Sequence, residues 1–101
     1  MSRRLQLQSK LEELLGSRNV YYQPPESLKM SYPCIRYDKG KPDVKHANNI
    51  KYINKDCYEI VVIDKKPDNA VIDKILELPY SSVDRHYTSD NLHHDVIILY
   101  Y

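Results

Sequence analysis

The chain has 101 residues and a mass of 12.0 kDa, so residues 1–101 fit a single domain and leave no room for a second. Hydrophobic residues make up 42% and charged residues 29%, which excludes an intrinsically disordered chain. The net charge is +1 and the pI is near 7.8, whereas dedicated nucleic-acid-binding domains usually have a pI above about 9. No run of about 18 apolar residues and no signal peptide is present, so we expect a protein made and kept in the cytoplasm, without a membrane span.

Residues 3–16 carry the leucine pattern of an amphipathic helix. Ser2 can cap the start of this helix, and Gly16 can end it in a left-handed conformation. Four leucines follow the spacing i, i+4, i+7 and i+8, which places them on one face: Leu7, Leu11, Leu14 and Leu15. We expect this face to pack on the core.

The pattern in the middle of the chain predicts three strands and a polar arm. A short strand over Val20–Gln23 stops at two prolines, and a second strand covers Pro33–Tyr37. Residues 38–56 are polar and contain turn signals, which predicts an extended hairpin or arm. Cys57–Ile63 is rich in β-branched residues and predicts a central strand covered on both faces.

The last third predicts a helix and two strands. The helix begins with Asp68 as its cap and runs to about Leu78. Strands over Ser81–Tyr87 and Asp95–Tyr101 are joined by a polar turn at Thr88–Asn91. The order αβββαββ indicates an α+β fold, a mostly antiparallel sheet covered on one face by two helices.

The cysteine and tyrosine contents limit the chemistry. Cys34 and Cys57 lie in strand-like segments without metal-ligand spacing, which predicts buried, reduced thiols. The chain has ten tyrosines but no phenylalanine or tryptophan. Tyrosine suits half-buried sites and protein interfaces, so these residues either fill the edges of the core or form contact surfaces.

Charge is distributed unevenly along the chain. Residues 1–56 hold 11 basic against 6 acidic residues, a charge of +5, and residues 57–101 hold 4 against 8, a charge of −4. If the two halves form different flanks of the domain, neighbouring copies can meet head to tail, and such contacts close into rings. If the halves mix in space, the surface is evenly charged.

Two arrangements of residues are of a type found in chemical sites: a histidine–aspartate set and a serine–histidine pair. His86, His93, His94 and Asp95 are of metal-binding type, but the adjacent His93 and His94 point to opposite faces of a strand, so we predict no metal site. Asp84, Arg85, Asp90 and Asp95 are instead expected to form turn hydrogen bonds and ion pairs. No motif of a nucleophile, a phosphate loop or a cofactor site is present, and a pairing of Ser89 with His86 has no orienting third group, so we predict no enzyme and no cofactor.

The polar arm also has features of a nucleic-acid-binding segment. Its lysines can contact phosphates, and Tyr52 can stack on a base. Three aspartates in residues 38–56 lower the charge of the arm to +2. A solvated arm, or one that contacts other subunits, is the favoured interpretation. The basic residues concerned are Lys39, Lys41, Lys45, His46, Lys51 and Lys55.

Several segments together resemble one protein family. They are Asp84–Val96 with the apolar end Ile97–Tyr101, Val20–Ser27 with Met30–Ile35, and Val62–Asn69. In their order and spacing, over nearly the whole chain, they resemble small head–tail joining or tail-completion proteins of long-tailed phages and prophages.

This resemblance implies a structural protein of the virion neck, made in the bacterial cytoplasm, that carries out no catalysis. It implies a tail-terminator subunit in a homo-oligomeric, typically hexameric ring, which ends the tail tube and joins it to the head. The implied partners are the major tail tube protein and the connector or stopper protein of the head, with DNA only as passing cargo. A neck stopper or adaptor under the portal is the alternative within the family, and a small nucleic-acid-binding or nuclease protein is the alternative outside it.

We expect two parts of the surface to contact neighbouring copies: the arm over Lys41–Tyr52, and the last strand as an open edge of the sheet. An added strand satisfies open backbone groups, and side chains set the specificity. The predicted interface residues are Lys41, Lys45, His46, Tyr52, Tyr100 and Tyr101.

Overall fold

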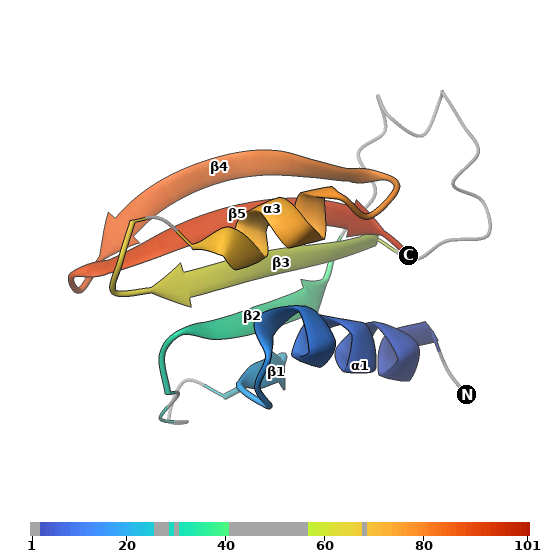
Figure 1. The fold of residues 1–101 in the computed structure, drawn as a ribbon, viewed down its shortest axis with the longest axis horizontal. Coiled ribbons are helices and arrows are strands. Elements are labelled where there is room, and N and C mark those ends of the chain that lie inside the picture. Colours follow the sequence, from blue (N-terminus) through green and yellow to red (C-terminus); the bar gives the residue numbers. More distant parts are fainter. Residues whose placement is uncertain (1–2, 26–28, 30, 41–56, 68) are drawn as a thin grey trace.

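The computed structural model describes residues 3–25, 29, 31–40, 57–67 and 69–101. The elements of this part of the chain are, in sequence order, α1 (Arg3–Leu15), β1 (Val20–Tyr22), β2 (Cys34–Lys39), β3 (Cys57–Asp64), α3 (Ala70–Leu76), β4 (Ser81–Ser89) and β5 (Leu92–Tyr100) (Figure 1). The order αβββαββ is as predicted, and no helix in the described residues is long and apolar enough to cross a membrane.

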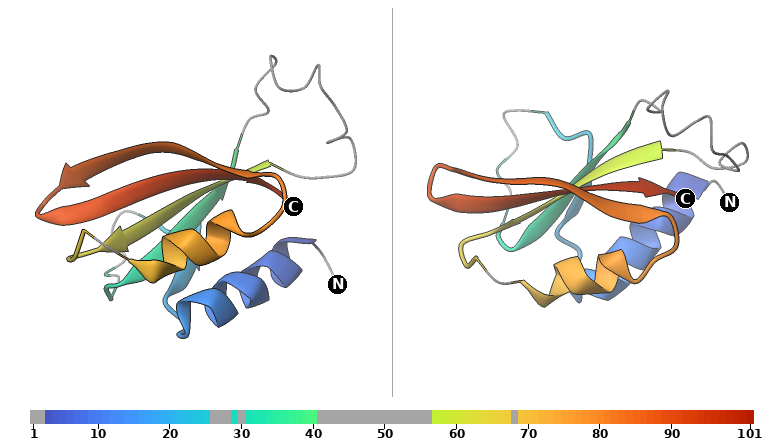
Figure 2. Two further views of the ribbon diagram at one scale, coloured as in Figure 1. Left: turned by 45° about the horizontal axis from the view of Figure 1, so that its top comes forward. Right: turned by 90° about the horizontal axis from the view of Figure 1, so that it is seen from above.

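The strands form one sheet in the order β1-β2-β3-β5-β4. β1 and β2 are parallel, and the other neighbouring pairs are antiparallel. Both helices lie on the same side of the sheet (Figures 1 and 2), which we call the helix face; the other side is the open face. The prediction of a mostly antiparallel α+β sheet with helices on one face is confirmed.

β3 lies in the middle of the sheet and is buried on both sides, as predicted. On the helix face, Tyr58, Ile60 and Val62 join a core that includes Leu7 and Leu11 of α1. On the open face, Val61 and Ile63 form a second, smaller cluster with Cys34 of β2 and Val96 of β5. Successive side chains of a strand point to opposite faces, so a nearly continuous apolar run on β3 supplies both clusters.

The N-terminal helix agrees with its sequence pattern. Leu7 and Leu11 are fully buried, and Leu14 and Leu15 pack against the same cluster. Gly16 has a φ of +79° and its N–H donates to the carbonyl of Glu12, so it ends α1 in the left-handed conformation that glycine adopts without strain.

The second helix is shorter than predicted, and its cap is a different residue. Asn69, not Asp68, is the N-cap: its side-chain oxygen accepts from the backbone N–H of Val71 at 2.8 Å. The amide nitrogen of Asn69 donates to Asp64 at 2.8 Å, which orients the capping oxygen. Asp68 itself lies outside the described residues, and the helix ends at Leu76 instead of Leu78.

The final hairpin differs from the prediction in its turn and in its place. Its turn consists of Asp90 and Asn91 alone, both with positive φ (53° and 63°), so the strands extend further than expected. A two-residue turn of this kind matches the twist of the flanking strands. The expectation that the last strand forms an edge is wrong: β5 lies between β3 and β4, and β4 is the edge.

The predicted arm is only partly described. Asp38 and Lys39 belong to β2, and the N–H of Gly40 donates to the carbonyl of Cys57 at 2.8 Å, so residues 40 and 57 are neighbours. Residues 41–56 lie outside the described residues, together with the predicted contacts Lys41, Lys45, His46 and Tyr52.

Candidate interaction surface

β4 is the most exposed element of the described chain. Every residue from Ser82 to Ser89 is exposed, so both faces of the strand meet solvent. Among the described residues β4 pairs with β5 alone, which leaves its other edge open. Within the described ranges, the exposed large hydrophobic side chains are Leu5, Tyr80, Val83 and Tyr87, and all but Leu5 lie on β4 or directly before it.

A bulge at Asp84 divides β4. Val83 pairs with Ile97 and Arg85 pairs with Val96, so Asp84 is an extra residue between them. Val83 therefore lies on the helix face, and Arg85 lies on the open face. Before the bulge the odd-numbered side chains of β4 point to the helix face, and after it they point to the open face.

On the helix face, the hairpin carries a histidine pair with a carboxylate. The Nδ1 of His86 lies 2.7 Å from a carboxylate oxygen of Asp95, which accepts the hydrogen bond. The rings of His86 and His93 stack with their centroids 5.6 Å apart. His86 is about half exposed, whereas Asp95 is only 19% exposed in its side chain. These contacts connect β4 to β5 through side chains.

On the open face, a second stack lies on the other side of the same strands. The rings of Tyr87 and His94 are 4.6 Å apart and nearly parallel, at 11°. The guanidinium of Arg85 lies 5.8 Å from the centre of the Tyr87 ring. It also forms ion pairs with Asp84 and, at 3.9 Å, with Glu59 of β3. Aromatic and arginine side chains of this kind predominate where proteins bind each other.

The structure separates several residues that the sequence left as possible partners. His93 pairs with Asp64 and His94 with Ile63, which places the two rings on opposite faces as predicted. No group of three or more ligands suited to a metal ion occurs among the described residues. Ser89 and His86 are three positions apart on one strand and therefore point to opposite faces, so they do not form a nucleophile–base pair.

Of the predicted interface residues, the last two tyrosines lie in or beside the core. Tyr100 is opposite Cys57 on the interior strand β5 and is 9% exposed, and Tyr101 packs against the helix-face core. Their contacts with other subunits remain a prediction. The edge residues Tyr80, Val83 and Tyr87 were not predicted as interface residues from the sequence. The polarity of Ser81–Ser89, beside the continuous apolar run that ends β5, is the signal that identifies the outer strand.

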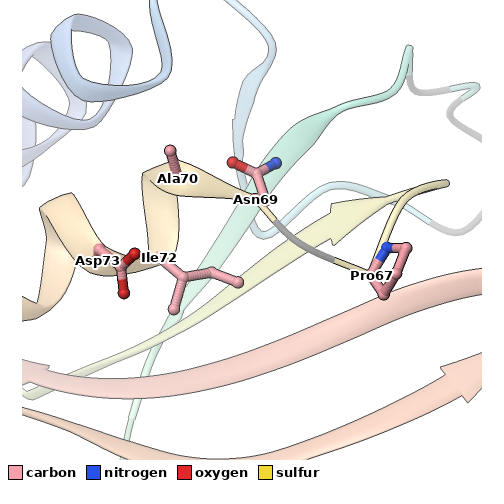
Figure 3. A pocket seen from close by; sticks show the side chains of 5 residues that line it. All are labelled: Pro67, Asn69, Ala70, Ile72 and Asp73. Carbon is pink, nitrogen blue, oxygen red and sulfur yellow. The ribbon is translucent and has the colours of Figure 1, made fainter.

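A pocket of about 440 Å³ lies beside the first turn of α3 (Figure 3). It is lined by Pro67, Asn69, Ala70, Ile72 and Asp73. The Asn69 side chain is already engaged by Val71 and Asp64, so its polar groups serve the helix cap. We assign no ligand to this pocket.

Both cysteines are buried and carry reduced thiols, as predicted. Burial raises the pKa of Cys34 to about 11, and the carboxylate of Asp64 raises it further by repelling the thiolate. Burial also raises the pKa of Cys57. A thiol reacts as its thiolate, so neither cysteine is an activated nucleophile.

Comparison with known proteins gives no match: no family model matches the chain, and no curated protein or solved structure is similar to it. The exposed arginine, histidine and aromatic side chains of the hairpin lie on β4: Arg85, His86 and Tyr87.

Proposed function

We propose that this protein is a structural subunit of the neck of a long-tailed phage or prophage, a tail-completion or tail-terminator protein. In this role it forms a ring at the head-proximal end of the tail, where it stops growth of the tube and joins the tube to the connector. It acts by shape and by contacts with other proteins, without a substrate.

The observation that carries this proposal is the position of the segment with the strongest resemblance. Within Asp84–Val96, residues 84–91 are all exposed on the edge strand β4 and its turn, whereas residues 92–96 lie half-buried or buried on β5. A resemblance confined to buried residues would reflect packing alone. Exposed residues are free of that constraint, so a resemblance in them supports a shared contact surface.

The distribution of charge also supports assembly into a ring. Residues 3–22 and 34–39, which hold α1, β1 and β2, carry a charge of +3, and residues 81–100, which hold β4 and β5, carry −2. In the sheet, β1 and β2 lie at one end, and β5 and β4 lie at the other (Figure 1). Opposite charges on opposite ends favour head-to-tail contacts, and these close into rings when the rotation between copies allows it.

Deletion of the gene from its phage or prophage tests this proposal. We expect particles without the protein to have tails of abnormal length, as seen by electron microscopy, because nothing ends the tube. Tails of normal length that fail to attach to heads would instead favour the stopper or adaptor role. Absence of the protein from purified wild-type virions would overturn both.

One observation favours a different class, a small nuclease. His86 is hydrogen-bonded to Asp95, and a carboxylate can orient an imidazole as a general base. Incubation of the purified protein with linear and circular DNA, with and without a divalent cation, tests this alternative. Chelator-sensitive cleavage that His86→Ala abolishes and Thr88→Ala retains would replace the virion role by an enzymatic one.

A further inference from the structure

We propose that the open edge of β4 binds the basic end of a second copy of this chain, the end formed by α1 and β1. This inference rests on the proposed function, because it names the contact by which copies join into a ring. The edge that contacts a neighbouring copy is thus β4, and not the last strand as predicted from the sequence.

The outer edge of β4 presents open backbone groups to a further strand. β4 has nine residues, contains no proline, and pairs on one side only among the described residues. The bulge at Asp84 interrupts this edge, so the regular part that can receive a neighbouring strand is Arg85–Ser89. Open edges attract other strands, and bulges and charges limit which strands can bind. The edge is therefore open but selective.

Exposed apolar side chains are concentrated on β4 and directly before it. Tyr80 is 48% exposed, Val83 56% and Tyr87 40%. Tyr87 is held by its stack on His94, so its ring is already ordered before a partner arrives. A pre-ordered aromatic side chain loses little conformational entropy on binding, which favours its use as an anchor.

The charge of the hairpin indicates which surface of a second copy binds it. Asp84 and Asp90 are exposed on β4 and at its turn, and the β4–β5 hairpin over residues 81–100 carries three aspartates and one arginine, a charge of −2. Two such acidic hairpins repel each other, which disfavours a contact of β4 with β4. Residues 3–22, which hold α1 and β1, carry four basic and two acidic residues, a charge of +2; Lys10 forms an ion pair with Glu13 at 3.9 Å, and the exposed Arg18 lies two residues before β1. The charges of the two ends are complementary, so a heterologous contact between copies is favoured.

Photo-crosslinking from Tyr87 tests the contact. A photoreactive phenylalanine analogue replaces Tyr87, and the variant is mixed with an isotope-labelled copy so that mass spectrometry separates contacts between copies from contacts within one. We expect crosslinks from the unlabelled hairpin to the labelled residues 1–25. Crosslinks to β4 of the labelled copy, or a protein that forms no crosslink between copies at its highest soluble concentration, would overturn the proposal.

Charge exchange provides a second, independent measurement. The acidic-edge variant is Asp84→Lys with Asp90→Lys, and the basic-end variant is Lys10→Glu with Arg18→Glu. We expect each alone to weaken self-association at least about tenfold by sedimentation velocity, and an equimolar mixture of the two to associate more tightly than either. Asp73→Lys with Glu77→Lys, which makes the same charge change on α3, is the matched control and should leave association within about threefold.

These results separate this inference from the proposed function. Each variant is first checked for an unchanged thermal unfolding midpoint, so that a loss of association is not a loss of folding. A contact between copies that is mapped to β4 and α1–β1, in a protein absent from virions, would retain the contact and end the neck assignment. A protein present in virions whose copies meet through other surfaces would do the reverse.

Discussion

Tyr37 shows how a chain without phenylalanine or tryptophan builds its core from tyrosine. Its side chain is fully buried on the helix face, and its hydroxyl donates to the side-chain oxygen of Gln8 on α1. Gln8 in turn donates to the carbonyl of Val20 at 3.0 Å, so one glutamine connects α1, β1 and β2. Tyr22 packs on Tyr37 with ring centres 4.9 Å apart. Tyrosine therefore serves as a core residue here wherever its hydroxyl has a partner.

Removal of the Tyr37 hydroxyl should destabilise the domain. We expect Tyr37→Phe to lower the free energy of unfolding by about 1 kcal/mol, because the carbonyl oxygen of Gln8 loses its donor in a partly buried place. Urea denaturation measures the change. The exposed Tyr87→Phe is the control and should change stability by less than about 0.5 kcal/mol. Equal effects at the two positions would contradict this account of Tyr37.

The Cys34 thiol predicts a dependence of stability on alkaline pH. Its pKa is raised to about 11 in the folded protein, whereas the pKa of a thiol in an unfolded chain is about 8.5. The folded state thus holds the proton more tightly. The raised pKa of Cys34 therefore adds to the free energy of unfolding. This contribution is fully present below the pKa of the unfolded thiol and is lost as the pH rises through the pKa of the folded one. We expect the stability of the wild type to fall more steeply than that of Cys34→Ala between these two pKa values; parallel pH profiles from urea denaturation would refute the assignment.

At the scale of elements, short-range chemistry fixes the ends of α3 and the turn of the hairpin. The cap of α3 depends on Asn69, whose side chain both accepts from Val71 and donates to Asp64. The turn between β4 and β5 depends on Asp90 and Asn91, which both take up the left-handed conformation. Asparagine and aspartate tolerate that conformation better than other non-glycine residues.

Loss of the α3 cap should be measurable and chemically specific. We expect Asn69→Ala to cost about 1 kcal/mol of stability, because the N–H of Val71 loses its acceptor. Asn69→Ser keeps a capping oxygen without placing a second carboxylate beside Asp64, and it should retain more of the stability than Asn69→Ala. Thermal unfolding by circular dichroism compares the variants, and an alanine variant as stable as the wild type would show that the cap is unimportant.

Substitutions in the turn should act on the hairpin. We expect Asn91→Val to destabilise by about 1–2 kcal/mol, since a β-branched residue is strained at its φ of 63°. Asn91→Gly adopts this conformation freely and should leave the stability close to that of the wild type. Hydrogen exchange of the β4 amides measures local opening of the hairpin, and equal protection in the valine variant and the wild type would contradict the turn assignment.

At the scale of the whole molecule, the sheet separates two unequal clusters. The helix-face core contains buried residues from α1, α3 and all strands except β4, whereas the open-face cluster is small: Cys34, Val61, Ile63 and Val96. β4 extends beyond both clusters, which explains why its residues are exposed on either side. β4 therefore supplies no buried side chain to either cluster and is accessible for binding.

Substitution of neighbouring β3 side chains by alanine should measure how much each of the two clusters contributes to stability. We expect Ile60→Ala on the helix face to cost about 2–5 kcal/mol, because the fully buried side chain leaves a cavity. Val61→Ala on the open face removes less buried surface and should cost at least about 1 kcal/mol. Chemical denaturation gives both values, and a neutral Val61→Ala would show that the open-face cluster contributes nothing to stability.

The sequence by itself determined the order of the elements, the buried face of α1 and the two-sided burial of β3, because each depends on a local pattern of apolar residues. The second helix and the last hairpin were predicted from the sequence, but their ends were predicted a few residues away from the observed ones. Those ends depend on the geometry of the Asn69 cap and of the Asp90–Asn91 turn, which composition does not specify. Only the tertiary structure decided that β5 lies inside the sheet and β4 at its edge. Strand order depends on which strand can bury both of its faces, and the apolar β5 does so between β3 and β4 while the polar β4 stays outside.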